Sequence, residues 1–141
     1  ARTMNTSLLR LTADDADGLG ILAAAVQDAL IQRADMKLNP RSRSFGLELN
    51  RFQWERAGKR GPYFRSRAIL AFTGVLRVRS VRLTANPADV VSLLDVRFEP
   101  GEAPAGTVRL VFAGGGELAL SVECLEATLM DTGPSWPTRR K

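Results

Sequence analysis

The chain has 141 residues and is 45% hydrophobic, which is enough for the core of one domain without disulfide or metal cross-links. It contains no histidine, and this removes the usual general base near neutral pH, the usual partner of a Ser or Cys nucleophile and the commonest zinc ligand. No catalytic, metal or cofactor motif stands out, so the composition favours a non-enzymatic protein. An enzyme that depends on Asp or Glu is the weaker alternative.

The charge is unevenly distributed along the chain. Residues 41–82, which we call the basic segment, hold eleven Arg or Lys residues against Glu48 and Glu55. This is a local balance of +9 in a chain whose net charge is +5. Such segregation predicts an anionic partner.

The sequence also indicates the cellular compartment. It has no apolar run of about 18 residues that could span a bilayer, and no signal-type segment near its start. Cys124 is the single cysteine, so no intramolecular disulfide can form. We expect a soluble cytoplasmic protein in which Cys124 is a buried structural residue, and the sequence leaves the oligomeric state open.

The first elements expected are a strand over residues 8–11 and a helix. Thr12 and Asp15 resemble a capping box at the helix start. Apolar residues then recur at three- and four-residue steps: Leu19, Leu22, Val26 and Leu30. This stripe predicts a helix that ends near Ala29.

From residue 34 the apolar period changes to alternation, which is typical of strands. Residues 34–38 and 45–49 flank the turn residues 39–42 and predict a β-hairpin. A second alternation over residues 68–78 is interrupted by Gly74. A two-residue turn there would pair Leu70 with Arg77 on one face, so we expect a three-residue loop or one long bent strand.

The C-terminal half predicts a strand over 94–98 and a hairpin of 108–112 with 118–122. In this hairpin Phe112 faces Leu118, and the glycines 114–116 form the loop rather than a phosphate cradle, because no helix follows them. The spacing of Val122, Leu125 and Leu129 predicts a closing helix. A strand over 125–129 is the alternative.

Together these elements predict an α+β fold. An N-terminal strand and helix precede about seven mainly antiparallel strands, arranged as a curled sheet or a pleckstrin-homology-like barrel, and a C-terminal helix follows. We expect a single globular domain over residues 7–136, with disordered ends at 1–6 and 137–141.

Several local strings resemble a known family: Leu49-Asn50-Arg51-Phe52 with Trp54, and the segments 98–104, 112–116 and 122–126. Over Leu8 to Trp136 the chain is similar to small bacterial proteins catalogued as a domain of unknown function. The resemblance implies a stand-alone bacterial protein rather than a fragment of a larger enzyme. It implies no activity, ligand or catalytic residue.

The basic segment supplies the candidate binding residues. Four of its arginines are odd-numbered whereas the core positions around them are even-numbered, so alternation places all four on one sheet face opposite the core. Two further arginines precede them in the same segment. The candidates for contact with an anionic partner are Arg65, Arg67, Arg77, Arg79, Arg51 and Arg43.

Several partners fit these residues. The leading hypothesis is a binding or adaptor module that docks an acidic protein surface, and the same arginines would also suit anionic lipid headgroups. The alternative is a nucleic-acid-binding protein in which arginines hold phosphates while Trp54, Tyr63 or Phe64 stack on bases. A solvated face whose arginines pair with acidic residues of segment 83–138 would need no partner.

No metal site is predicted. Asp14, Asp15 and Asp17 are explained by helix capping and the helix dipole, and Glu123 and Glu126 by a solvated helix face.

Overall fold

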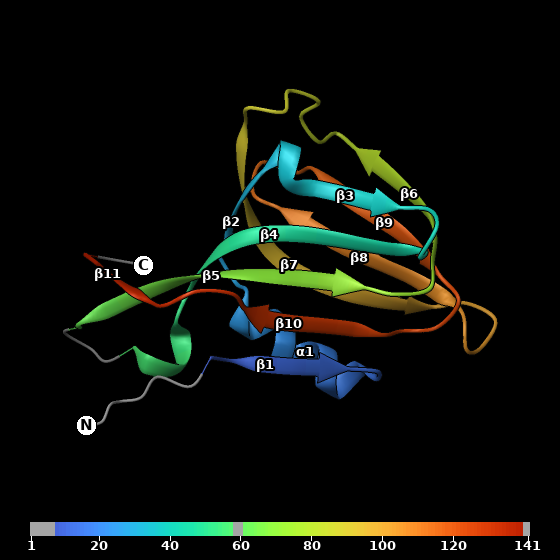
Figure 1. Ribbon diagram of the computed structural model, residues 1–141. Coiled ribbons are helices and arrows are strands. Elements are labelled where there is room, and N and C mark those ends of the chain that lie inside the picture. The colour runs from blue at the N-terminus through green and yellow to red at the C-terminus, as the bar shows by residue number, and fades with distance from the viewer. Residues whose placement is uncertain (1–7, 58–60, 140–141) are drawn as a thin grey trace.

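The computed structural model describes residues 8–57 and 61–139. Within these ranges the chain forms an 11-stranded antiparallel sheet and one α-helix, α1 (Ala16–Ala25) (Figure 1). The strands are β1 (Arg10–Ala13), β2 (Leu30–Gln32), β3 (Met36–Asn39), β4 (Ser44–Phe52), β5 (Tyr63–Phe72), β6 (Val75–Val81), β7 (Val90–Pro100), β8 (Gly106–Phe112), β9 (Glu117–Val122), β10 (Ala127–Asp131) and β11 (Trp136–Thr138). Two single-turn 3-10 helices are η1 (Arg33–Asp35) and η2 (Trp54–Arg56). The predicted α+β class is therefore wrong, because the protein is mainly antiparallel sheet.

The sheet curls into two layers. Its strands follow the order β1-β10-β5-β4-β2-β7-β8-β9-β6, with β3 beside β4 and β11 beside β5. Strand β2 pairs with β4 on one edge and with β7 on the other, so it joins the layers. In Figure 1, β3, β4, β5 and β10 form the layer nearer the viewer, and β7, β8 and β9 lie behind it. Strands β1 and β6 are the two ends of the hydrogen-bonded path.

The core lies between the layers because apolar residues alternate along the long strands. Strand β5 buries every second residue from Ser66 to Phe72, and β8 buries Val108, Leu110 and Phe112. Helix α1 adds Leu19, Leu22 and Ala23 to the same core.

Helix α1 begins three residues later than the predicted capping box, in which Thr12 would be the cap residue; Thr12 lies in β1 instead. The side chain of Asp15 accepts a hydrogen bond from the backbone N–H of Gly18 at 2.7 Å, which satisfies one of the free donors of the first turn. The helix ends at Ala25, not near Ala29 as expected, and the backbone N–H of Val26 closes it on the preceding turn.

Both predicted hairpins are present, one with a different register. Strand β3 pairs with β4 around the turn at residues 40–43. In the β8–β9 hairpin, Leu110 is paired with Leu118, two residues away from the predicted register. The Phe112 N–H donates to the Gly116 carbonyl at 2.9 Å and so shortens the loop. A shift of two residues leaves each side chain on its predicted face, so the apolar pattern could not detect it.

The predicted C-terminal helix is wrong. Residues 127–131 form β10, which lies between β1 and β5 and pairs with both. Ala127, Leu129 and Asp131 are buried at alternate positions, as a strand in this place requires. A helix here would leave the facing edges of β1 and β5 without partners for their N–H and C=O groups.

The connection after β5 also differs from the prediction. Strand β5 pairs with β4, β10 and β11, whereas β6 pairs with β9 in the other layer. The chain crosses between layers at Thr73-Gly74, where Gly74 has a φ of +69°. Neither the three-residue loop nor the long bent strand is present, because β10 occupies the edge of β5 that a hairpin would use.

Three further expectations concern the termini and Cys124. Strand β11 extends the paired chain to Thr138, past the expected domain boundary at residue 136. The expected ends at residues 1–6 and 140–141 lie outside the described residues. Cys124 is exposed, so its prediction as a buried residue is wrong; it follows β9 in the turn that leads to β10.

Candidate anion-binding surface

The four odd-numbered arginines point away from the core, but they are divided between the two layers. Arg65 and Arg67 lie on β5, and Arg77 and Arg79 lie on β6, the end strand of the other layer. The expected single basic face is therefore split, because the chain crosses between layers at Thr73-Gly74.

Arg51 is fully buried and cannot meet a partner at the surface. Its Nε donates to Asp131 Oδ1 at 2.7 Å and its Nη2 to Asp131 Oδ2 at 2.9 Å, while Glu55 accepts two further hydrogen bonds. Asp131 also accepts from the Leu9 N–H and the Ser66 hydroxyl, at 3.1 and 3.2 Å. This cluster ties β1, β4, β5 and β10 together, so the role of Arg51 is structural.

Opposing effects act on the ionisable groups of this cluster. Burial lowers the pKa of Arg51, but its hydrogen bonds to Asp131 and Glu55 outweigh burial and raise that pKa above the ordinary value. Burial raises the pKa of Asp131 and of Glu55, yet the hydrogen bonds from Arg51 leave both pKa values below their ordinary range. All three groups therefore stay charged near neutral pH.

Two of the remaining candidates are paired with carboxylates. Arg67 contacts Asp35 at 3.3 Å and Glu48 at 3.2 Å. Arg43 forms an exposed ion pair with Glu123. Of these pairs, only Arg43–Glu123 uses an acidic residue of segment 83–138, as the hypothesis of a solvated face expected. The partners of Arg67 lie outside that segment.

Arg65 is partly covered by its surroundings. Its guanidinium lies 5.8 Å from the centre of the Phe52 ring, and its Nη1 lies 3.5 Å from the carbonyl oxygen of Asn50. Burial lowers the pKa of Arg65, with Asp28 acting in the opposite direction.

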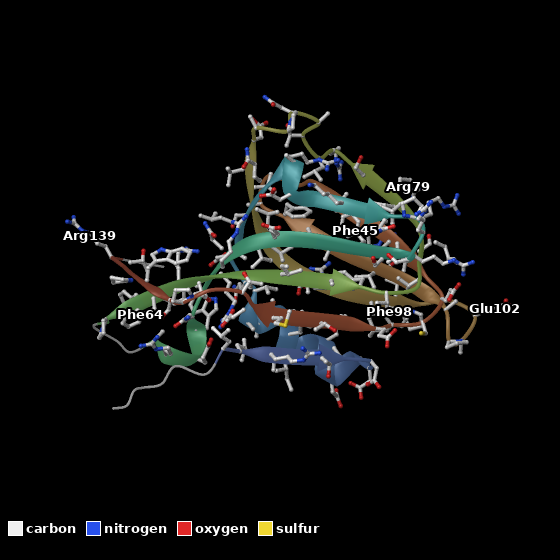
Figure 2. All side chains as sticks on the ribbon, viewed as in Figure 1. Phe45, Phe64, Arg79, Phe98, Glu102 and Arg139 are labelled. Carbon is white, nitrogen blue, oxygen red and sulfur yellow. The ribbon has the colours of Figure 1, made fainter. Side chains whose placement is uncertain are left out.

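Arg77 and Arg79 differ from these residues, because neither has an ion pair or side-chain hydrogen bond within residues 8–57 and 61–139. Both side chains are exposed on the outer side of β6. Figure 2 shows Arg79 beside β6, at the margin of the molecule.

The two arginines border a groove of about 210 Å³ across β6, β9 and β8. The register places two rows of side chains on this outer surface. Its lining residues are Arg79, Ala119 and Arg109 in one row, and Arg77, Ser121 and Thr107 in the other. We call this surface the β6 groove. Its floor is formed by the short side chains of Ala119 and Ser121 on the central strand β9, between the longer side chains on β6 and β8.

Arg109, on the far wall of the β6 groove, is held in place by carboxylates. Its Nε lies 2.8 Å from Glu99 and its Nη1 2.6 Å from Glu117. The hydrogen bonds that Arg109 donates to Glu99 and Glu117 raise its pKa above the ordinary value. The unpaired positive charge of the groove therefore lies on the β6 side, at Arg77 and Arg79.

The aromatic candidates for base stacking lie elsewhere. Trp54 packs edge-on against Phe52 with ring centres 4.6 Å apart, and its Nε1 donates to the Gln27 carbonyl at 2.9 Å. Tyr63 contacts the same Phe52 ring at 5.7 Å. The guanidinium of Arg56 covers the Phe64 ring at 3.9 Å. In Figure 2, Phe64 and Arg79 lie at opposite ends of the molecule.

Arg109, in the β6 groove, and Asp131, in the cluster around Arg51, were not expected from the sequence. Arg109 is odd-numbered in a strand with an even-numbered core, so alternation alone could have placed it on the outer surface. The predicted register would have set it opposite Ser121 rather than Ala119. No local signal marked Asp131 as the partner of Arg51, because the two residues are 80 positions apart.

Other kinds of site have little support in the described part of the chain. Residues 8–57 and 61–139 contain no group of three Cys, Asp or Glu side chains placed to hold a metal ion. A hollow of about 370 Å³ between β1, α1 and η2 is mainly apolar, and its one carboxylate, Glu55, is bonded to Arg51. None of the described helices is long and apolar enough to cross a membrane.

The fold and the groove define a mainly antiparallel β protein with a curled sheet and a basic end strand. The chain belongs to the family described as Protein of unknown function (DUF2948), whose sequence model matches residues 9–141. This match confirms the resemblance carried by the local strings. No curated protein matches the chain.

Proposed function

We propose that the protein is a non-enzymatic cytoplasmic binding module that uses the β6 groove to dock an acidic protein surface. The observation that supports this most is the pair Arg77 and Arg79, which are exposed, adjacent on one strand face and without a carboxylate partner in the described residues. The lone, exposed Cys124 is compatible with a reducing compartment.

The geometry suits carboxylates presented at regular spacing. Residues two apart on a strand are separated by about 7 Å, and strands two apart by about 10 Å. Arg79 and Arg109 thus lie on either side of Ala119, and Arg77 lies beside Ser121 in the next row. A partner's side chains can descend between these arginines. Arginine binds carboxylate through two parallel N–H groups, and Arg77 and Arg79 would exchange water for such contacts without breaking an existing ion pair.

Nucleic acid fits this surface less well. Single-strand binders combine cations with aromatic platforms on the same surface, whereas Trp54, Tyr63 and Phe64 lie away from β6 and contact protein groups. Of the arginines that would extend a phosphate track, Arg67 and Arg43 are already paired with carboxylates.

Fluorescence anisotropy with labelled polyglutamate, single-stranded RNA and duplex DNA tests the proposal. We expect polyglutamate to bind with an affinity that falls as salt rises, and Arg79→Glu to weaken it at least about tenfold. Arg10→Glu is the matched control, since it makes the same charge change on β1, at the other end of the strand order. Equal losses in both variants would mean that only net charge matters.

Tight RNA binding at physiological salt that is lost in Trp54→Ala would replace the proposal with the nucleic-acid alternative. Thermal unfolding of each variant checks that the fold is retained.

A further inference from the structure

Strand β6 ends the hydrogen-bonded path of the sheet and pairs with β9 along one edge. At its start, the Val75 N–H donates to the Arg43 carbonyl at 2.8 Å, and this is the one backbone hydrogen bond on its other side in the described residues. Figure 1 shows β6 at the margin of the molecule. An end strand of this kind presents a row of unpaired N–H and C=O groups.

The hydrogen-bond phase tells which residues of β6 face that free edge. In antiparallel pairs, bonded and non-bonded residue pairs alternate. The Phe112 N–H donates to the Gly116 carbonyl, so the even-numbered residues of β8 and β9 form the hydrogen-bonded pairs between these two strands. The odd-numbered residues of β9 therefore direct their N–H and C=O groups to β6. The partners of those odd-numbered residues are Arg77, Arg79 and Val81.

The intervening residues of β6, Val78 and Ser80, therefore direct their N–H and C=O groups to the free edge. Neither has another backbone hydrogen bond within the described residues. Ser80 is exposed, and Leu76, the extra residue of the bulge between Val75 and Arg77, is 57% exposed. The free edge thus combines backbone donors and acceptors with the partly buried Val78 on one side and two arginines on the other.

A second copy of this chain is a poor occupant. Antiparallel pairing of β6 with itself would bring the Arg77 and Arg79 side chains of both copies onto one face, where like charges repel. A strand with carboxylates on that face would attract the arginines and could form the same hydrogen bonds with the backbone of Val78 and Ser80.

We propose that the acidic partner binds as an extended strand that adds antiparallel to the free edge of β6. This inference rests on the proposed function and specifies its partner as a segment of alternating acidic and apolar residues. The acidic side chains would lie beside Arg77 and Arg79, and the apolar ones beside the partly buried Val78. Main-chain hydrogen bonds to Val78 and Ser80 would supply affinity, and the alternation would supply specificity.

A seven-residue probe of alternating glutamate and valine, capped at both ends, matches the length of β6. In antiparallel addition the valine amides face β6 and the glutamate amides face solvent. N-methylation of the valines should weaken binding at least about tenfold, since it removes the inter-strand hydrogen bonds. N-methylation of the glutamates, at equal charge, should change the affinity less than about twofold.

A protein variant gives an independent test. Ser80→Pro removes one edge-facing N–H without touching a bond to β9, and proline is tolerated at such edge positions. It should weaken the unmethylated probe several-fold, whereas Ser80→Ala should bind like the unaltered protein. Circular dichroism and thermal unfolding confirm that each variant is folded.

The outcomes separate the two proposals. Binding that requires Arg77 and Arg79 but is insensitive to the methylation pattern would overturn strand addition and leave the proposed function standing. Loss confined to the probe with methylated glutamates would overturn antiparallel addition. A probe that fails to bind while polyglutamate still binds would overturn strand addition alone, and polyglutamate binding that is insensitive to Arg79→Glu would overturn the proposed function.

Discussion

Replacing Asp131 by Asn should destabilise the protein strongly, although it changes only one atom of the side chain. Asp131 is 5% exposed and holds the fully buried Arg51 through two hydrogen bonds of 2.7 and 2.9 Å. Removing one partner of a buried ion pair costs about 3–5 kcal/mol, because the remaining charge is left uncompensated. Glu55 still contacts Arg51 from the solvent side, so we expect a loss near the lower limit, about 3 kcal/mol.

Urea unfolding followed by circular dichroism measures this loss of free energy. In thermal unfolding, a chain of this length should show a fall in Tm of about 10 °C. The matched control is Glu123→Gln, which makes the same chemical change in the exposed pair with Arg43. The two side chains of that pair are 60% and 48% exposed, and such pairs contribute less than about 1 kcal/mol. If the two variants lost equal stability, burial of the Arg51 pair would not be the cause.

The double variant Arg51→Met with Asp131→Leu separates unpaired charge from lost packing. Apolar residues of similar volume often replace a buried ion pair without loss. The double variant should therefore recover most of the stability lost in Asp131→Asn. A double variant as unstable as the single one would show that the hydrogen bonds across β1, β4, β5 and β10 cannot be replaced by packing.

Three other predictions concern stability. The folded pKa values of Asp131 and Glu55 lie below their ordinary values. The stability that these carboxylates provide is therefore present above about pH 4 and is lost as the pH falls through the folded pKa values. In urea titrations from pH 7 to pH 3, the free energy of unfolding should fall less for Asp131→Asn than for the unaltered protein. Gly106→Ala should cost about 1–3 kcal/mol by thermal unfolding, since its Cβ would lie 2.6 Å from the carbonyl oxygen of Glu99. Gly20→Ala should instead add about 0.5–1 kcal/mol, because no atom lies within 4 Å of its Cβ in the exposed face of α1; a loss would contradict the assigned helix.

Strand-local features of this fold could be predicted from the sequence. Alternation of apolar residues located β4, β5, β8 and β9 and assigned each side chain to the core or the surface, because the period of two belongs to the strand itself. Turn residues located the β3–β4 and β8–β9 hairpins, and the acidic residues at 14–17 marked the region where α1 starts. The resemblance to the family of unknown function also came from local strings and was confirmed.

Pairing between distant strands was not predictable in the same way. Residues 127–131 have spacings compatible with a helix or a strand, and only the open edges of β1 and β5 select the strand. The register of β8 with β9 was missed because a shift of two residues preserves every face.

For the candidate site too, local features could be predicted and contacts between distant residues could not. Alternation by itself determined that Arg65, Arg67, Arg77 and Arg79 point outward, since the side-chain direction in a strand depends only on position along it. Only the tertiary structure decided that two of them share a layer with Asp35 and Glu48 while the other two border the β6 groove. It also placed Arg51 in the interior beside Asp131, because burial and ion pairing depend on which distant segments the fold brings into contact.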